Sequence, residues 1–272
     1  MNQNMLLVQL SMLTEAGRPN NFLEFLTLHM SNANILILAS LSGLATLVGV
    51  FLGSLFKKTQ KNIILSASFS AGLMILISVF ELIPTAFKDI DIKSLFFWTT
   101  FGAFMLWIAN MIIPHLHSMN EIKDCKGKCL MKMSYLVAIG LVLHDFPEGF
   151  AIPSSFGHSA SLGFMVVIAT FLHNIPEGYI LTLSQTKSGG KGFCFTAAAF
   201  SVLATFLGAI LGIALLASFQ NLNPIFLCLA AGAMLFIAIH ELLPESFRYK
   251  DIKTFVLGIA LAFFVYFVLR LL

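Results

Sequence analysis

Charged residues are scarce in this chain. Asp, Glu, Lys and Arg make up 11% of its 272 residues, whereas about a quarter of the residues of a soluble domain carry charge. The net charge is only +3, and the lysines lie in short clusters between apolar runs, so no basic face for nucleic acid is predicted. With 58% hydrophobic residues and 28 Phe, the composition indicates an integral membrane protein embedded in a lipid bilayer.

Cysteine pairs and nucleotide-binding motifs are also lacking. The four cysteines show no run of paired spacings, which argues against a disulfide framework. No P-loop is present, which argues against a nucleotide partner and against direct drive by ATP. Residues 1–33 carry Glu15, Arg18 and Glu24 without a long apolar core. We therefore expect an N-terminal extracytoplasmic segment at the membrane periphery and not a cleavable signal peptide.

Long apolar runs dominate the rest of the chain. A helix needs about 20 apolar residues to cross a bilayer, and eight runs meet this length. They cover residues 34–56, 62–87, 94–114, 134–153, 161–184, 193–218, 224–247 and 252–271. The predicted fold is all-α, with eight transmembrane helices in a single domain at 34–272 and a cytosolic loop at 115–133.

The distribution of Lys and Arg predicts the orientation. With the N-terminus outside, twelve basic residues fall on the inner side and four on the outer side. The inner set is Lys57, Lys58, Lys61, Lys123, Lys126, Lys128, Lys132, Lys187, Lys191, Arg248, Lys250 and Lys253, and the outer set is Arg18, Lys88, Lys93 and Arg270. Cytosolic loops are enriched in basic residues, so both termini are expected to be extracytoplasmic.

An internal repeat links the two ends of the chain. "AGLMILISVFELIPTAFK" at 71–88 aligns with "AGAMLFIAIHELLPESFR" at 231–248 at an offset of 160, and span one aligns with span six at 159. Five spans separate the copies, and because five is odd, the copies must cross the membrane in opposite directions. Spans one to three and six to eight are thus predicted to form an inverted repeat around antiparallel spans four and five, a 3+2+3 arrangement. Many secondary transporters are built this way, with the site near mid-membrane.

The two central spans carry a duplicated polar motif. "LHDFPEGF" occupies 143–150 and "LHNIPEGY" occupies 172–179. His144 and Glu148 are four residues apart and so share one helical face, as do His173 and Glu177. Ionised carboxylates at bilayer depth cost several kcal/mol and persist where something compensates them. A divalent cation would do so.

Imidazole and carboxylate together suit zinc and neighbouring transition metals better than calcium or magnesium. Asp145 and Asn174, each one residue beyond a histidine, could reach a second cation or hold the ligands in place. A lone His–Glu pair in a span could instead be a buried ion pair that holds two helices together. The presence of two copies on adjacent antiparallel spans favours the metal site.

Weaker candidates lie near the span ends and in the loop. Glu81, His240 and Glu241 could line the two mouths of a cation path or cap helices at the interface. The loop 115–133 holds four possible soft ligands, His115, His117, Cys125 and Cys129. They could bind an arriving metal ion, or they could be chance ligands in a solvated linker, because C-x-x-x-C is not a specific zinc signature.

The motifs "HDFPEG", "HNIPEG" and "HELLPES", on eight spans with both ends outside, resemble the ZIP family of divalent metal transporters in its bacterial branch. The resemblance covers residues 34–272. It implies import of zinc, and often iron, manganese, cobalt or cadmium, into the cytosol across the bacterial inner membrane by alternating access. It implies a binuclear site formed by His144, Asp145, Glu148, His173, Asn174 and Glu177, with His240 and Glu241 on the release side; the repeat adds Glu81 on the opposite side. At the family level a homodimer is expected.

One position departs from the family pattern. Many similar members carry Glu-Pro on span six, whereas this chain has Thr205 and Phe206 in "SVLATFLGA". The second metal position therefore lacks one carboxylate, and the sequence leaves open whether the site holds one cation or two.

Two other classes of function stay open at this point. An intramembrane zinc-dependent hydrolase would use similar ligands, but no H-E-x-x-H is present and Pro244 stands where the second histidine should be. A metal sensor or a structural membrane protein would move no metal across the membrane. The inverted repeat favours transport, because only a transporter must present one site to both faces of the membrane.

Overall fold

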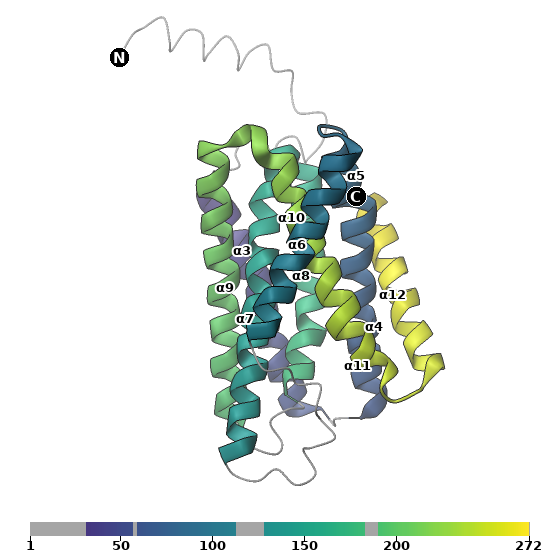
Figure 1. The fold of residues 1–272 in the computed structure, drawn as a ribbon. Helices are drawn as coiled ribbons and strands as arrows, with labels where there is room; N and C mark the ends of the chain where they lie inside the picture. The colour runs from purple at the N-terminus through teal and green to yellow at the C-terminus, as the bar shows by residue number, and fades with distance from the viewer. Residues whose placement is uncertain (1–30, 57–58, 113–127, 183–189, 272) are drawn as a thin grey trace, which may run out of the picture.

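The regular structure of the described residues is entirely helical (Figure 1). The computed structural model describes residues 31–56, 59–112, 128–182 and 190–271. The long helices are α3 (Asn32–Leu55), α4 (Gln60–Ile77), α6 (Ile92–Ile112), α7 (Lys128–His158), α8 (Ala160–Leu181), α9 (Gly190–Ser218), α10 (Asn223–Ile237) and α12 (Ile252–Leu271). The shorter elements are η1 (Ser78–Leu82), α5 (Ile83–Phe87), η3 (Gln220–Leu222), η4 (Ala238–Leu242) and α11 (Leu243–Phe247).

The helices lie where the apolar runs predicted spans. Within the described residues, seven helical segments are long and apolar enough to cross a membrane. The predicted fourth span, 134–153, was too short at both ends, since α7 covers 31 residues and contains Pro147 and Pro153. Apolar composition marks only the part of a helix that faces hydrocarbon, and prolines are tolerated inside membrane helices. The structure is thus an all-α membrane protein with seven to eight apolar helices.

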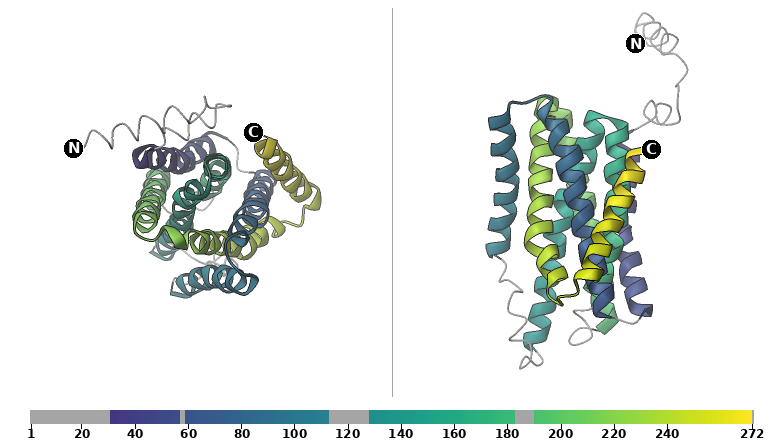
Figure 2. Two further views of the ribbon diagram at one scale, coloured as in Figure 1. Left: turned by 90° about the horizontal axis from the view of Figure 1, so that it is seen from above. Right: turned by 90° about the vertical axis from the view of Figure 1, so that its right-hand side faces the viewer.

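Helices α3, α7, α8 and α9 form one group of the bundle. In this group α7 packs on α9 and on α8, and α3 packs on α8 and on α9. Helix α4 joins this group to α12, and α10 joins it to α6. Figure 2 shows α6 and α12 at the periphery, and they are the least buried of the seven candidate spans.

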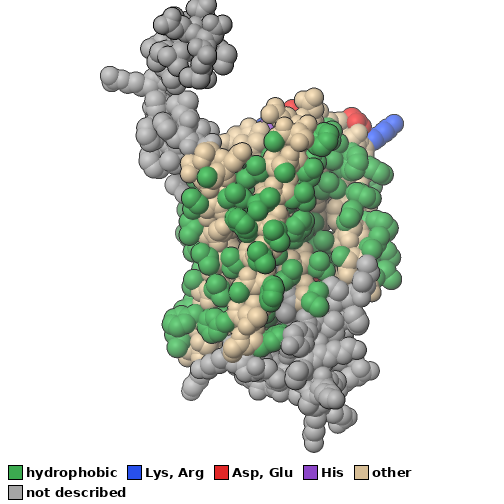
Figure 3. Space-filling view, turned by 90° about the vertical axis from the view of Figure 1, so that its left-hand side faces the viewer, with side chains coloured by type: hydrophobic (Ala, Val, Ile, Leu, Met, Phe, Trp, Pro, Cys, Tyr) green, Lys and Arg blue, Asp and Glu red, His purple; other side chains and the backbone are tan. Residues whose placement is uncertain are grey.

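The outer surface is apolar. Phe96, Phe97, Phe264 and Phe267 are each more than half exposed. The space-filling view shows hydrophobic side chains over most of the visible face, with acidic and basic side chains gathered at one end (Figure 3). Apolar exposure on this scale needs a non-aqueous environment, as expected for a multi-pass membrane protein.

Each of α4 and α10 runs into a single π-helical turn. In η1 the Ile83 N–H bonds to the Ser78 carbonyl, and in η4 the Leu243 N–H bonds to the Ala238 carbonyl, both across five residues. A proline follows at the start of α5 and of α11, and proline cannot donate the next backbone hydrogen bond. Such turns often lie at functional sites, and these two contain Glu81 and Glu241.

Aspartates cap the two peripheral helices outside the membrane-spanning segments. The Ser94 hydroxyl donates to Asp91 Oδ1 at 2.6 Å at the start of α6, and the Thr254 hydroxyl donates to Asp251 Oδ2 at 2.7 Å at the start of α12. The Ser94 hydrogen bonds lower the pKa of the Asp91 carboxyl below its ordinary value of 3.8, and those of Thr254 do the same for Asp251.

Replacing Asp91 with alanine should lower the thermal unfolding midpoint at neutral pH. Because the folded pKa is depressed, the ionised cap stabilises the protein above the ordinary value of 3.8, and this contribution is lost as the pH falls through the lowered pKa. The difference between wild type and variant should therefore shrink when melting is repeated at acidic pH. An equal difference at both pH values would contradict an ionised cap.

Candidate metal centre

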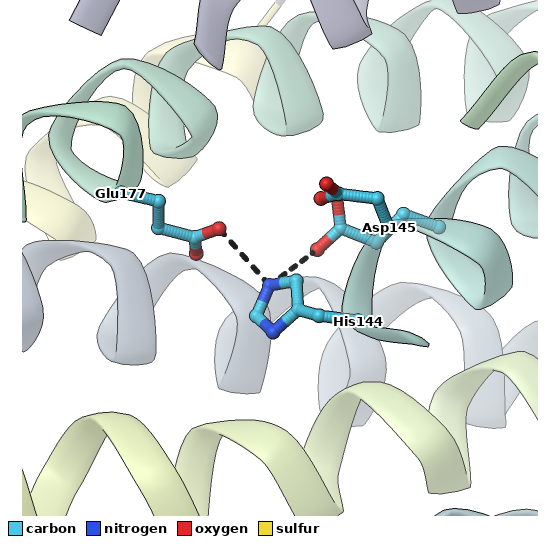
Figure 4. A group of neighbouring side chains, drawn as sticks. His144, Asp145 and Glu177 are labelled. Atoms are coloured by element: carbon cyan, nitrogen blue, oxygen red, sulfur yellow. Dashed lines mark ion pairs between the residues drawn. The ribbon is translucent and has the colours of Figure 1, made fainter. Parts of the chain in front are cut away.

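The duplicated motifs meet at one buried point between α7 and α8. His144 Nε2 lies 3.1 Å from Glu148 Oε1 and 3.0 Å from Glu177 Oε2. His173 Nε2 lies 3.0 Å from the same Glu148 Oε1. Figure 4 shows the His144 ring pointing toward Glu177 from the neighbouring helix. Each helix supplies a His–Glu pair on one face, and the two faces are turned toward each other.

These side chains are shielded from solvent. Glu148 and Asp145 are fully buried, and His144, His173 and Glu177 are at most 5% exposed. Glu148 Oε2, Asp145 Oδ1 and Glu177 Oε1 have no hydrogen-bond partner among the described residues. No Lys or Arg of the described chain lies within ion-pair distance of these carboxylates. Buried carboxylate oxygens without donors, in a cluster without Lys or Arg, are costly, so the cluster fits a cation site.

The donor atoms are close enough to share one ion. One ligand atom each from His144, Asp145, Glu148 and Glu177 lies within 4.8 Å of the others. Nitrogen and oxygen ligands bind zinc at about 2.0 to 2.2 Å, so small side-chain shifts would bring these atoms around one metal. His173 is joined to the group through Glu148.

Asp145 and Asn174 each reach an adjacent helix. The Ser201 hydroxyl of α9 donates to Asp145 Oδ2. Asn174 Nδ2 donates to the Ser42 carbonyl of α3 at 3.1 Å, and Asn174 Oδ1 has no partner among the described residues. Sequence reasoning missed Ser201, although its place in the span-one to span-six alignment, opposite Ser42, was a usable signal.

Glycines bring α3, α7, α8 and α9 into backbone contact around the cluster. A Cβ at Gly149 would overlap the Thr205 carbonyl, and one at Gly208 would overlap the Phe146 carbonyl. On the other side, a Cβ at Gly178 would overlap the Thr46 carbonyl, and one at Gly49 would overlap the Ile175 carbonyl. Each motif is thus pressed directly against α9 or α3.

Replacing Gly178 with alanine should destabilise the protein by about 1–3 kcal/mol, the usual cost of overpacking a well-packed core. The new methyl group would push α8 away from the Thr46 carbonyl of α3 and displace the adjacent Glu177. Gly140→Ala is the matched control, because a Cβ there meets nothing within 4 Å. Thermal melting of both variants tests the contact, and equal midpoints would contradict it.

Thr205 lies beside this cluster, fully buried on α9. Its hydroxyl donates to the Ser201 carbonyl at 3.2 Å, and its backbone packs on Gly149, next to Glu148. The position at which the family resemblance led us to expect a carboxylate therefore adjoins the centre, and Thr205 provides a hydroxyl there.

The remaining candidates lie outside the cluster. Glu81 accepts a hydrogen bond from the Tyr266 hydroxyl at 2.6 Å, and Glu241 accepts one from Asn110 at 2.7 Å. The His240 ring stacks on Phe236, with centroids 4.8 Å apart. His115, His117 and Cys125 fall outside the described residues, and Cys129 belongs to α7 with an undescribed side chain.

Comparison with known proteins identifies the family. Residues 113–267 match the family described as "ZIP Zinc transporter". The chain is 38% identical over 232 residues to the zinc transporter ZupT of Streptococcus mutans, a match that covers 78% of this chain and 87% of that protein. It is 33% identical to ZupT of Shigella dysenteriae over 135 residues and to ZupT of Escherichia coli O127:H6 over 138 residues; each of these matches covers 47% of this chain and 52% of the relative.

A family match over more than half of the chain, a relative aligned over most of its length and a buried His/carboxylate cluster agree with one another. They decide against the hydrolase, because the family consists of transporters. This chain belongs to the ZIP family of zinc transporters in its bacterial branch, and it is a transporter of divalent metal ions and not an enzyme.

Proposed function

We propose that this protein imports zinc into the cytosol by alternating access, with His144, Glu148, His173 and Glu177 as the central ligands. One observation carries the proposal: the carboxylates of Glu148 and Glu177 are buried, face two imidazoles and have no Lys or Arg partner in the described chain. A zinc ion would compensate this charge. Zinc as the substrate is supported by the names of the relatives, and iron, manganese, cobalt and cadmium are expected competitors because the ligands are of intermediate softness.

Asp145 and Asn174 form the second metal position in this proposal. Asp145 keeps one oxygen without a partner, as does Asn174, and both lie one residue from a central histidine. With Thr205 in place of a carboxylate, this position has one full negative charge. We therefore propose that it holds a second cation only transiently, while the first position binds tightly.

The proposed inverted repeat gives the site access to both faces. Three features recur at an offset of 160 residues and support it: the π-helical turns, the aspartate caps of α6 and α12, and the packing of α4 on α12 and of α10 on α6. In the proposed cycle α3, α7, α8 and α9 move as one group against α4, α6, α10 and α12. The ion then passes His240 and Glu241 on release.

The proposed orientation places both termini outside the cytoplasmic membrane. Lys and Arg are concentrated on the side that then faces the cytosol. An inside-negative potential favours inward movement of a divalent cation, at about 2.3 kcal/mol per charge per 100 mV. The electrochemical gradient of the metal is thus sufficient in principle to drive uptake.

Uptake of radioactive zinc into proteoliposomes tests the proposal. Wild type should accumulate zinc, and His173→Ala should not. His158→Ala is the matched control, because this histidine lies exposed at the end of α7 and should leave uptake unchanged. Competition by iron, manganese, cobalt and cadmium ranks selectivity. If zinc binds stoichiometrically to wild type but never accumulates inside, the transport mechanism is wrong.

A further inference from the structure

Two glutamates occupy equivalent places in the two halves of the chain. Glu81 in η1 and Glu241 in η4 are 160 residues apart, each third from a proline that follows. Figure 1 shows the adjoining α5 and α11 at opposite ends of the molecule. Equivalent residues at the two mouths of a symmetric path would be expected to serve the same purpose, but their surroundings differ.

Glu81 is held by two side chains of α12. The Tyr266 hydroxyl donates to Glu81 Oε1 at 2.6 Å, and Arg270 Nε lies 3.9 Å from the same oxygen. Tyr266 is 7% exposed, and its ring packs near Phe80 with centroids 6.0 Å apart. The carboxylate therefore has a short hydrogen bond and a nearby positive charge from within the protein.

Glu241 has a different set of neighbours. Asn110 of α6 donates to its Oε1 at 2.7 Å, and among the described residues no Lys or Arg lies within 4.0 Å of it. His240 precedes it in the same π-helical turn. The offset of 160 pairs Phe80 with His240, Tyr266 with Leu106 and Arg270 with Asn110.

The differences at these three pairs of positions decide whether each glutamate carboxylate can bind a metal ion. Arg is always charged and competes with a metal for the carboxylate, whereas the amide of Asn110 is neutral. The Tyr266 hydroxyl occupies a lone pair of the Glu81 carboxylate. Leu106, the equivalent residue, has no donor and leaves the Glu241 carboxylate free of this bond. The residue before Glu241 carries an imidazole, a ligand type suited to transition metals, whereas the equivalent Phe80 ring carries no ligand atom.

We propose that Glu81, Tyr266 and Arg270 form a metal-excluding clasp between η1 and α12, so that of these two equivalent glutamates Glu241 is the one left to bind the metal. The clasp ties α4 to α12 and gives Glu81 a structural role in place of the mouth-lining role suggested by the repeat. The assignment of the two ends to the outside and the cytosol rests on the proposed function. With that orientation, an arriving ion meets Glu81 already held by the clasp at the outer mouth and meets His240 and Glu241 on leaving.

The test converts the Glu81 end into a copy of the Glu241 end. The triple variant Phe80→His, Tyr266→Leu, Arg270→Asn is purified in detergent, and bound Co²⁺ is counted by equilibrium dialysis and followed by its visible absorption. We expect one more equivalent of Co²⁺ than in wild type, and its loss when Glu81→Gln is added to the triple variant. A monodisperse triple variant that gains no Co²⁺, or gains Co²⁺ that survives Glu81→Gln, would overturn the proposal.

The reciprocal change covers the case in which the triple variant fails to fold. Leu106→Tyr with Asn110→Arg should place a clasp on Glu241 and remove the same amount of bound Co²⁺ as Glu241→Gln removes. Unchanged Co²⁺ binding in this variant would also overturn the proposal. Both counts are made without a gradient, so they stand apart from zinc uptake by wild-type proteoliposomes, whose failure would refute the proposed function alone.

Discussion

Zinc uptake should fall by at least about 100-fold when Glu148 is replaced by glutamine. Removing a group that merely orients a ligand costs about 10–100-fold in metal affinity or activity, and Glu148 is a direct ligand in the proposed site. Its Oε1 is the atom shared by the two histidines, at 3.1 Å from His144 and 3.0 Å from His173. Glutamine keeps the size of the side chain and one acceptor oxygen, so the change removes charge with little change in shape. Initial rates in proteoliposomes measure the loss.

Glu245→Gln is the matched control for this experiment. Glu245 lies in α11, about a third exposed, with Arg248 3.5 Å away, and it is not part of the central cluster. Its uptake should stay close to that of wild type. Wild-type uptake by Glu148→Gln would mean that the metal crosses elsewhere, and the duplicated motif would then be a buried structural pair.

The positions of the helices could be predicted because bilayer thickness dictates their length. Seven apolar runs coincide with helical segments that are long enough to span, with boundaries within a few residues. The fourth was underestimated because α7 continues beyond its apolar stretch through Pro153 to His158. Hydropathy reports contact with lipid, whereas the end of a helix depends on local capping and packing.

The central cluster could be predicted only in part. Spacing alone placed His144 with Glu148 and His173 with Glu177, since residues four apart share a helical face. The contact between His144 and Glu177 depends on how α7 and α8 are rotated against each other, and one sequence does not contain that rotation. The hydrogen bond from Ser201 to Asp145 was missed for the same reason, because it joins α9 to α7.

The ends of the path show a similar limit. The sequence alignment pairs Glu81 with Glu241, and each lies in a π-helical turn, but their partners Tyr266 and Asn110 come from helices far away in the chain. Alignment within the repeat therefore finds the acids and gives no account of their different surroundings. The partners of the two glutamates are known only from the three-dimensional structure, in which α12 packs on α4 and α6 packs on α10.

Replacing Thr205 with glutamate should convert the centre into a tight zinc trap. Thr205 is fully buried next to Gly149, one turn beyond Ser201, which contacts Asp145. Gly43 of α3 packs closely on Thr205, since a Cβ at Gly43 would lie 3.2 Å from Thr205 Oγ1, so any longer side chain at position 205 carries a packing cost. A glutamate would add a fourth carboxylate to Asp145, Glu148 and Glu177. Without metal the added charge is uncompensated, and a buried unpaired charge costs about 3–5 kcal/mol.

The added charge should destabilise the protein without metal and stabilise it when zinc is bound. Chelator-treated Thr205→Glu should melt below wild type, whereas saturating zinc should raise its midpoint by more than it raises that of wild type, because a ligand that binds only the folded state stabilises it in proportion to its affinity. Thr205→Gln, equal in size but neutral, should show the packing cost alone and gain no extra stabilisation from zinc. Affinity should rise by at least about 10-fold, equivalent to about 1.4 kcal/mol. Uptake should then slow, because the ion must leave the same ligands on each cycle. Identical zinc responses of the Glu and Gln variants would mean that position 205 does not reach the metal, and the missing carboxylate would then have no bearing on how many ions the centre holds.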